Sequence, residues 1–193
     1  MEQRPDQVLS QLLSALAEAR LGVALIGGYA VVTWGIPRAT FDVDLLIEAD
    51  DERLRRAFVA LERHGFGIED IYKSGWRDQV RDMPLVKVQM FRGGRAVSGD
   101  LFPVTTPLQR SAFARSRTVG LPGVAPAVRV VSPADLILFK LLADRPKDRL
   151  DIQNVLTVQG VPDADYLRAF AQQLGVLDRL DRAITDAGLG PKV

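Results

Sequence analysis

The chain has no cysteine and a single histidine, His64, among its 193 residues. The lack of cysteine excludes disulfides and cysteine-ligated zinc, and one histidine leaves little scope for histidine-based metal or acid–base chemistry. Neither sign of charge is in excess, with 25 basic and 24 acidic residues, so no general nucleic-acid-binding surface is indicated. Any chemistry must therefore rest mainly on carboxylates, lysine and arginine.

Long apolar runs and a secretory signal are also missing. The longest apolar stretch, residues 21–36, falls short of the roughly 18 to 20 residues that span a bilayer and is interrupted by Gly27 and Gly28. The first residues, MEQRPDQ, lack the basic-then-apolar pattern of a signal peptide. We therefore expect a cytoplasmic protein with no membrane segment.

Hydrophobic content of 47% is enough for one well-packed core, and its periodicity predicts the elements. Apolar residues at three- and four-residue steps predict helices, whereas short apolar runs predict strands. The helices expected in the first half cover residues 6–20, 29–34 and 51–64. The strands expected there cover residues 23–26, 42–48, 85–91 and 96–102, and Gly93 and Gly94 favour a hairpin turn between the last two.

The second half of the chain is predicted to be helical. Ser132 and Asp135, with Pro133 between them, form the pattern of a helix-capping box. The helices expected there cover residues 132–143, 146–159, 163–174 and 175–187. We predict an α+β fold, a mixed β-sheet flanked by helices. Its α/β core covers residues 1–125, and a helical C-terminal part, residues 126–193, packs on the core after the Pro- and Gly-rich stretch 122–126.

Two acidic residues stand at the start of a predicted strand. Asp42 and Asp44 project from the same side because strand side chains alternate between faces. Two like charges this close repel each other unless a cation lies between them, and oxygen-only ligands suit Mg²⁺ or Mn²⁺. If the strand that carries Asp100 pairs with this one, three carboxylates could hold two metals for an in-line displacement at phosphorus.

A glycine pair follows the first predicted strand. Without side chains, Gly27 and Gly28 let the backbone approach a triphosphate, and the helix after them directs free N–H groups at the anion. Each feature alone has an ordinary structural interpretation. The acidic pair would be a solvated strand edge, the glycines a tightly packed turn, and Asp100 a surface acid. The joint pattern favours a functional site, and other phosphate-binding motifs are absent from the sequence.

The segment GGYAVVTWGIPRATFDVDLLI resembles the opening motif of the DNA polymerase beta type nucleotidyltransferase superfamily, in which a Gly-Gly or Gly-Ser turn precedes a strand bearing Asp-x-Asp. Residues 38–40 and the later segment FKLLADRPKDRLDIQNVL resemble the abortive-infection toxin-like (type IV toxin–antitoxin) group and its uncharacterised relatives. The similarity to antibiotic nucleotidyltransferases is limited to the first motif. The resemblance implies a nucleotidyltransferase fold.

The resemblance also implies roles for the site residues. Gly27 and Gly28 would contact the triphosphate, Asp42 and Asp44 would bind the metals, and Asp100 would complete the metal site. As a hypothesis, Asp100 is also the base that activates an acceptor hydroxyl. The implied activity is Mg²⁺-dependent transfer of a nucleoside monophosphate from an NTP to a hydroxyl on RNA such as tRNA, on a protein or on a small molecule. The alternative is a non-catalytic binding module, for example a toxin–antitoxin component with an antitoxin partner.

Three further residues carry open alternatives. Lys140 interrupts an apolar run, so it is either a triphosphate ligand or the i,i+4 ion-pair partner of Asp144. Arg38 is either a phosphate clamp or a solvated turn residue. Trp76 is a candidate for stacking on a base, although a packed loop position is favoured. We therefore predict a nucleotide-binding set of Gly27, Gly28, Arg38 and Lys140.

Overall fold

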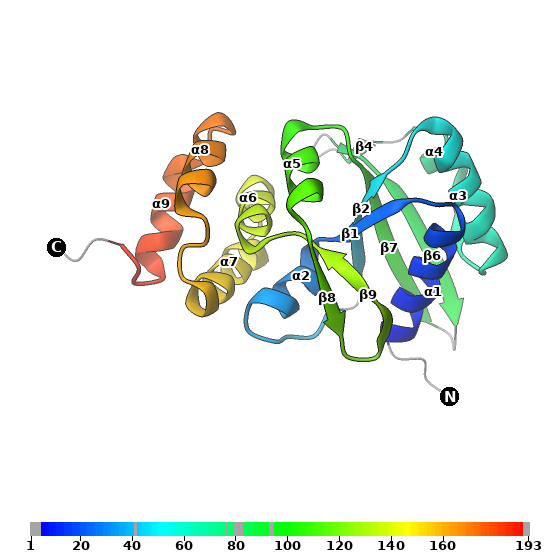
Figure 1. Cartoon of the computed structure of the whole chain (residues 1–193), viewed down its shortest axis with the longest axis horizontal. Helices are drawn as coiled ribbons and strands as arrows, with labels where there is room; N and C mark the ends of the chain where they lie inside the picture. Colours follow the sequence, from blue (N-terminus) through cyan, green and yellow to red (C-terminus); the bar gives the residue numbers. More distant parts are fainter. Residues whose placement is uncertain (1–4, 41, 76, 79–82, 93–94, 191–193) are drawn as a thin grey trace.

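The computed structural model describes residues 5–40, 42–75, 77–78, 83–92 and 95–190. Within these ranges, a seven-stranded mixed sheet forms the centre of the fold (Figure 1). In spatial order its strands are β3 (Gly67–Ile68), β6 (Val86–Arg92), β7 (Arg95–Pro103), β2 (Val43–Glu48), β1 (Gly22–Leu25), β9 (Val124–Val130) and β8 (Arg117–Leu121). The pairs β2–β7 and β1–β9 are parallel and the other pairs are antiparallel. A separate ladder joins β4 (Arg77–Asp78) to β5 (Met83–Pro84).

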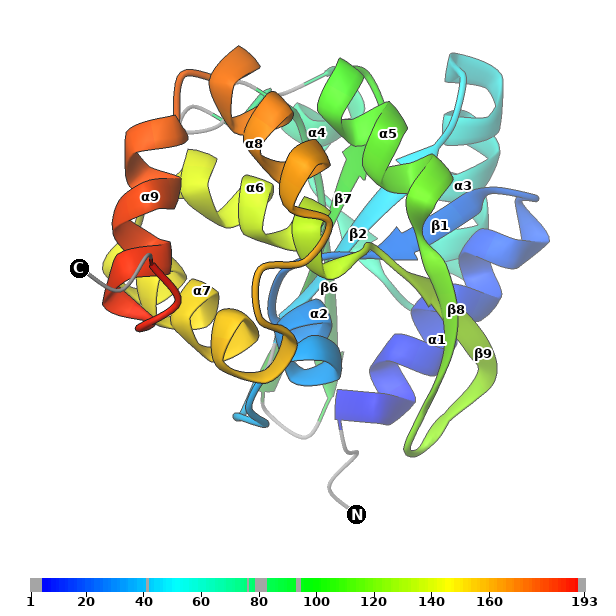
Figure 2. The ribbon, with the colours of Figure 1, turned by 60° about the vertical axis from the view of Figure 1, so that its left-hand side comes forward.

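Two long helices, α1 (Pro5–Glu18) and α3 (Asp51–Arg63), pack against each other beside the sheet, on the right in Figures 1 and 2. The α1 stripe of Leu9, Leu12 and Leu16 is completely buried, and each such side chain contributes roughly 1.5 to 3 kcal/mol of hydrophobic stabilisation. The short helix α4 (Asp70–Lys73) follows β3. The helical periodicity in the first half of the sequence therefore predicts these core-facing stripes correctly.

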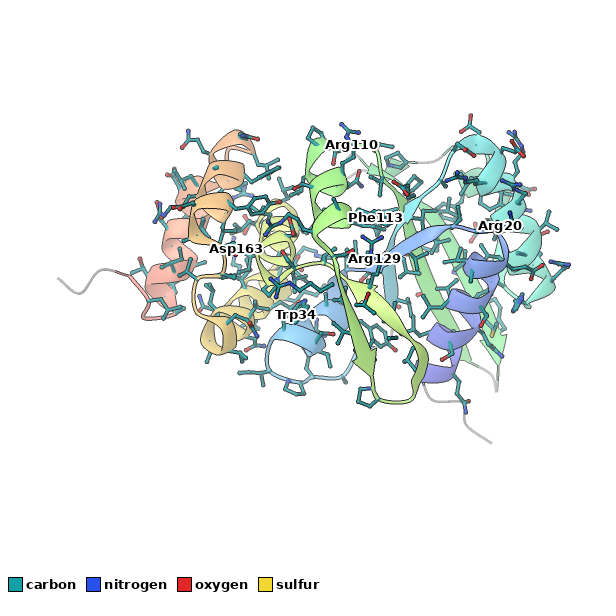
Figure 3. All side chains as sticks on the ribbon, in the orientation of Figure 1. Arg20, Trp34, Arg110, Phe113, Arg129 and Asp163 are labelled. Atoms are coloured by element: carbon teal, nitrogen blue, oxygen red, sulfur yellow. The ribbon has the colours of Figure 1, made fainter. Side chains whose placement is uncertain are left out.

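The helical part lies at the other end of the molecule, on the left in both views (Figures 1 and 2). It consists of α6 (Pro133–Ala143), α7 (Pro146–Gln159), α8 (Ala164–Gln173) and α9 (Leu177–Asp186). The helix α2 (Gly27–Trp34) contacts both α6 and α7. Trp34, labelled in Figure 3, donates its indole N–H to the carbonyl of Val131 at 2.7 Å, and Gln159 donates to the carbonyl of Trp34 at 2.8 Å. These contacts join the helical part to the core.

A buried carboxylate holds α8 against the rest of the protein. Asp135 of α6 is fully buried and accepts hydrogen bonds from the hydroxyls of Ser132 and Tyr166 and, at 3.2 Å, from Arg115. Arg115 comes from α5 (Pro107–Arg115), and its guanidinium carbon lies 3.8 Å from the centre of the Tyr166 ring. Burial and then the hydrogen bond to Asp135 raise the pKa of Tyr166 to about 12. The end of α5 is held in turn by Arg129 of β9, which lies over the Phe113 ring at 4.3 Å (Figure 3).

Several parts of the architecture were not predicted. They are β3, α4, the β4–β5 ladder and the β8–β9 hairpin, and no bounds were predicted for α5. The stretch 122–126 does not separate core from helices, because Pro122 and Gly123 form the turn of that hairpin and β9 continues through residue 130. The division at residue 125 stays a prediction, with β9 running across it.

Some predictions concern residues outside the described ranges. The structure describes neither Trp76 nor the Gly93–Gly94 turn, although β6 and β7 on either side of that turn pair as a hairpin. Within the described ranges, no helix has the length and apolar character needed to cross a membrane.

Candidate active site

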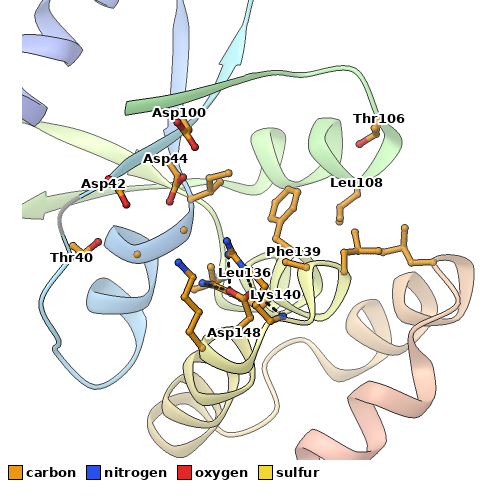
Figure 4. Close-up of a pocket in the computed structure, with 18 of the residues that line it drawn as sticks. Thr40, Asp42, Asp44, Asp100, Thr106, Leu108, Leu136, Phe139, Lys140 and Asp148 are labelled. Atoms are coloured by element: carbon orange, nitrogen blue, oxygen red, sulfur yellow. Dashed lines mark hydrogen bonds and ion pairs between the residues drawn. The ribbon is translucent and has the colours of Figure 1, made fainter. Parts of the chain in front are cut away.

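The three predicted carboxylates lie on or next to two neighbouring strands. The parallel register of β2 and β7 places Asp44 directly beside Asp100, so their side chains project from the same face of the sheet. Asp42 lies one residue before β2, and its carboxylate accepts a hydrogen bond of 2.6 Å from the Ser98 hydroxyl. Figure 4 shows all three acids on one side of a pocket. The pairing of these two strands, on which the role predicted for Asp100 depends, is therefore present, while the chemical roles of the acids stay predictions.

The glycine pair lies directly against this acidic group. Gly27 has φ of +59°, and a Cβ placed on it would lie 1.9 Å from Oδ2 of Asp44. A Cβ on Gly28 would lie 2.2 Å from the Thr40 hydroxyl oxygen. Both glycines are the first residues of α2, whereas the sequence predicted that the helix begins at Tyr29. Their N–H groups therefore belong to the first helical turn, where backbone donors lack helical partners and the dipole favours an anion.

Lys87 is a site residue that the sequence reasoning missed. It lies on β6 opposite Asp100, and its ammonium group forms an ion pair with that carboxylate. Burial lowers the pKa of Lys87, but the hydrogen bond and the charge of Asp100 outweigh this effect and raise the pKa above its usual value. The signal was available, because the predicted hairpin around Gly93 and Gly94 already places residue 87 opposite residue 100.

Two of the three carboxylates, those of Asp42 and Asp44, suit a magnesium ion. Within the described ranges, no set of three acidic or histidine side chains forms a metal-binding cluster. Asp42 accepts a hydrogen bond from Ser98, and Asp100 forms an ion pair with Lys87. Mg²⁺ commonly takes only one or two carboxylates and completes its shell with water and substrate phosphates. The Asp42 and Asp44 carboxylates fit that smaller requirement.

Lys140 lies between two buried carboxylates of the next helix. Its ammonium nitrogen is 2.8 Å from Oδ1 of Asp148 and 2.6 Å from Oδ2 of Asp151. The predicted i,i+4 pair with Asp144 is wrong, since the Asp144 carboxylate instead pairs with Arg149 and Arg179. Lys140 is only 5% exposed, so its charge is balanced inside the protein. Its role as a triphosphate ligand stays a prediction.

Arg38 belongs to the same ion-pair network. Its Nε and Nη2 atoms donate to the two oxygens of Asp151 at 2.8 and 3.0 Å, a bidentate arrangement that fixes the guanidinium plane. Arg38 is thus exposed, as the solvated-turn alternative expects, but it is also held by an ion pair, and its role as a phosphate clamp stays a prediction. At the other end of the network, Arg145 donates to both oxygens of Asp148 at 2.5 and 3.0 Å. We define the ion-pair network as Arg38, Asp151, Lys140, Asp148 and Arg145.

One pocket of about 630 Å³ is lined by the acidic group, the glycine pair and every member of the ion-pair network except Asp151. Its volume lies in the range of small-molecule sites. Every residue of the predicted catalytic and nucleotide-binding sets lines it: Gly27, Gly28, Arg38, Asp42, Asp44, Asp100 and Lys140. The sequence did not single out Thr40, Lys87, Ser98 and Arg145, which also line it.

Comparison with known proteins identifies the family. A family model described as "Nucleotidyltransferase of unknown function (DUF6036)" matches residues 5–182. The chain belongs to this nucleotidyltransferase family. No curated protein sequence matches it significantly.

Solved structures of antibiotic nucleotidyltransferases share the fold of this family member. The solution structure of the antibiotic-resistance factor ANT(2'')-Ia has a TM-score of 0.58 at 17% identity, covering 90% of this chain and 94% of that chain. The crystal structure of ANT(2'')-Ia in complex with adenylyl-2''-tobramycin has a TM-score of 0.57 at 18% identity, covering 88% of this chain and 97% of that chain. The lincomycin-bound lincosamide antibiotic adenylyltransferase LnuA has a TM-score of 0.55 at 16% identity, covering 80% of this chain and 98% of that chain. The likeness in fold therefore extends well beyond the first motif, to which the sequence prediction limited it.

The ion-pair network predicts an acid limit to the stability of this nucleotidyltransferase. Burial alone raises the pKa of Asp148, but the hydrogen bonds and charges of Arg145 and Lys140 outweigh it and lower the pKa to about 2. The pKa of this carboxyl group is lower in the folded state than its ordinary value of 3.8. The ionised group therefore stabilises the fold at pH values above about 4. We expect this contribution to be lost as the pH falls from about 4 to about 2.

Thermal denaturation across that pH range measures the effect. The Asp148→Asn variant, which cannot titrate at this position, should show a smaller dependence of melting temperature on pH than the wild type. Parallel pH profiles for the two proteins would contradict the expectation.

Proposed function

We propose that this nucleotidyltransferase moves a nucleoside monophosphate from an NTP to a hydroxyl acceptor in a Mg²⁺-dependent reaction that releases pyrophosphate. The observation that carries the proposal is the juxtaposition of Asp44, Asp100 and Gly27. Asp44 and Asp100 are paired in register, and Asp44 is in contact range of the glycine turn. An anion site and an acidic site thereby share one pocket, which is the combination that phosphoryl chemistry needs.

The substrate NTP would be held at the glycine turn. The first-turn N–H groups of α2 face the triphosphate, and Lys147, which also lines the pocket, adds a positive charge. Asp42 and Asp44 would hold Mg²⁺ or Mn²⁺, which when bound neutralises charge on the phosphate oxygens. Arg38 and Lys140 contribute positive potential, although both are already paired with carboxylates of the ion-pair network.

The acceptor hydroxyl would be activated by Asp100. Its carboxylate takes the hydroxyl proton as the acceptor oxygen forms a bond to the α-phosphorus. The bond from that phosphorus to the oxygen bridging to the β-phosphate breaks, and pyrophosphate leaves with the electron pair. Lys87 acts as a positioning residue that holds the Asp100 carboxylate through their cross-strand ion pair.

Labelling with nucleotides tests the proposal. The purified protein is incubated with each of the four α-labelled NTPs and with total RNA, cell proteins or a small-molecule extract. We expect label to be transferred to one of these fractions with Mg²⁺ and not with EDTA. Calorimetric binding of ATP and Mg²⁺ without transfer of label from any NTP to any fraction would overturn the proposal and support the non-catalytic module instead.

A further inference from the structure

The half of the pocket away from the carboxylates has an apolar wall. The apolar lining residues of the pocket, which we call the wall, come from α5, α6, α8 and the residue that follows α8: Leu108, Leu136, Phe139, Leu142, Phe170 and Leu174. Figure 4 shows Leu108 and Phe139 across the pocket from the three acids. Among the described lining residues that α5 and α8 contribute, no side chain carries a charge. This half therefore offers apolar contact area with few groups that recognise charge.

The acids that line the pocket offer few carboxylates to pair with a positively charged ligand. Asp42, Asp44, Asp100 and Asp148 are the acidic residues in the described lining. Asp148 is neutralised by Lys140 and Arg145, and Asp100 by Lys87. On the proposed function, Asp42 and Asp44 are occupied by the metal. An acceptor with several ammonium groups would find no free carboxylate there, and desolvating such groups without a partner is costly.

The apolar wall also lies on the acceptor side of the chemistry. The strand β7 carries Asp100 and leads, through Thr106, directly into the first turn of α5 at Leu108. The glycine turn and Lys147, which would hold the triphosphate, belong to α2 and α7. A molecule that presents a hydroxyl to Asp100 therefore shares the pocket with Leu108 and with the apolar side chains of α6 and α8.

We propose that the acceptor is a neutral small molecule with a hydroxyl group and an aromatic or branched apolar body that rests on this wall. The inference rests on the proposed function and names its substrate class. The wall is held in shape before binding, because Tyr166 of α8 bonds to Asp135 of α6 and to Ser111 of α5, the latter at 3.0 Å. A preformed apolar surface binds without the entropic cost of ordering its side chains.

A matched pair of substitutions tests the wall. Leu142, 39% exposed, lines the pocket, whereas Leu150, 68% exposed on α7, does not. The probe is 4-methylumbelliferyl glucoside, a neutral, aromatic and hydroxylated molecule followed by fluorescence anisotropy. We expect Leu142→Glu to weaken its binding by about tenfold or more, because a carboxylate then replaces apolar contact area. Leu150→Glu should bind within about twofold of the wild type, and the neutral variant Leu142→Gln should show an intermediate loss.

Two further measurements decide which ligand the wall takes. The glucosamine trimer, with three ammonium groups, should bind the wild type more weakly than the glucoside and bind Leu142→Glu more tightly than the wild type. α,β-Methylene-ATP with Mg²⁺ should leave the glucoside bound. Equal glucoside affinity in both Glu variants, preference of the wild type for the trimer, or displacement of the glucoside by the nucleotide analogue would overturn the proposal. Failure of the analogue to bind would count against the proposed function alone, since the glucoside measurements still test the wall.

Discussion

Replacing Asp44 by asparagine is expected to lower nucleotide transfer by at least about 10³-fold, equivalent to about 4 kcal/mol in the barrier. The asparagine side chain has nearly the same shape as the native one, so the close packing against Gly27 is retained and only the negative charge is lost. Because the charge is what attracts the metal, binding of NTP with Mg²⁺ should weaken together with the rate. Pyrophosphate release under saturating Mg²⁺ measures the effect.

Asp50→Asn is the matched control for this substitution. Asp50 is the N-cap of α3 and accepts from the backbone N–H of Arg53 at 2.8 Å, outside the pocket. Asparagine caps helices about as well as aspartate, so the control should retain both fold and activity. If Asp44→Asn stayed within a few-fold of the wild type under Mg²⁺, the proposed mechanism would be wrong.

Much of the acidic part of the site was predictable from local rules, whereas the parallel pairing of β2 with β7 that brings Asp100 beside Asp44 is a long-range contact. Alternation of side chains along a strand put Asp42 and Asp44 on one side, and the hairpin before Asp100 is encoded by its own turn residues. The register of that hairpin also contains the Lys87–Asp100 pair. The position of Lys87 beside Asp100 was therefore predictable from the same turn residues.

The ion-pair network was not predictable in the same way. For Lys140, the ion-pair alternative to triphosphate binding was a partner four residues away, because spacing along one helix is the information that a single sequence gives most directly. Its actual partners, Asp148 and Asp151, lie on α7 and meet Lys140 only because α6 and α7 pack together. Arg38 and Asp151 are 113 residues apart and carry no local signal of their pairing.

The β8–β9 hairpin was missed for a chemical reason. Pro and Gly occur both in tight turns and in linkers. Pro122 and Gly123 were interpreted as part of a linker, whereas they form a tight turn. The strand β8 lies at the edge of the sheet, and none of its residues is fully buried. An edge strand of this kind lacks the strong apolar run by which the buried strands were recognised.

Removing the charge of Asp151 is expected to destabilise the fold strongly. Asp151 is nearly buried and accepts from both Arg38 and Lys140, so Asp151→Asn leaves Lys140 to share Asp148 with Arg145. Breaking a buried ion pair by removing one partner costs about 3 to 5 kcal/mol. For a chain of this length we expect the melting temperature to fall by roughly 6 to 20 °C. Thermal denaturation at neutral pH measures the loss.

Asp144→Asn provides the same chemical change at an exposed ion pair. Asp144 pairs with Arg149 at 2.9 Å, and the exposed fractions of the two side chains are 29% and 70%. Because solvent screens this interaction, we expect only a small change in melting temperature. Adding Lys140→Met to Asp151→Asn should recover part of the lost stability, because the cation left without its second carboxylate is then removed. Equal melting temperatures for the two Asp→Asn variants, or a double variant less stable than Asp151→Asn alone, would show that the network does not act as a buried, charge-balanced unit. If both expectations hold, the same network that joins α6 to α7 also fixes Arg38 at the pocket, and stability and the shape of the nucleotide site depend on one set of charges.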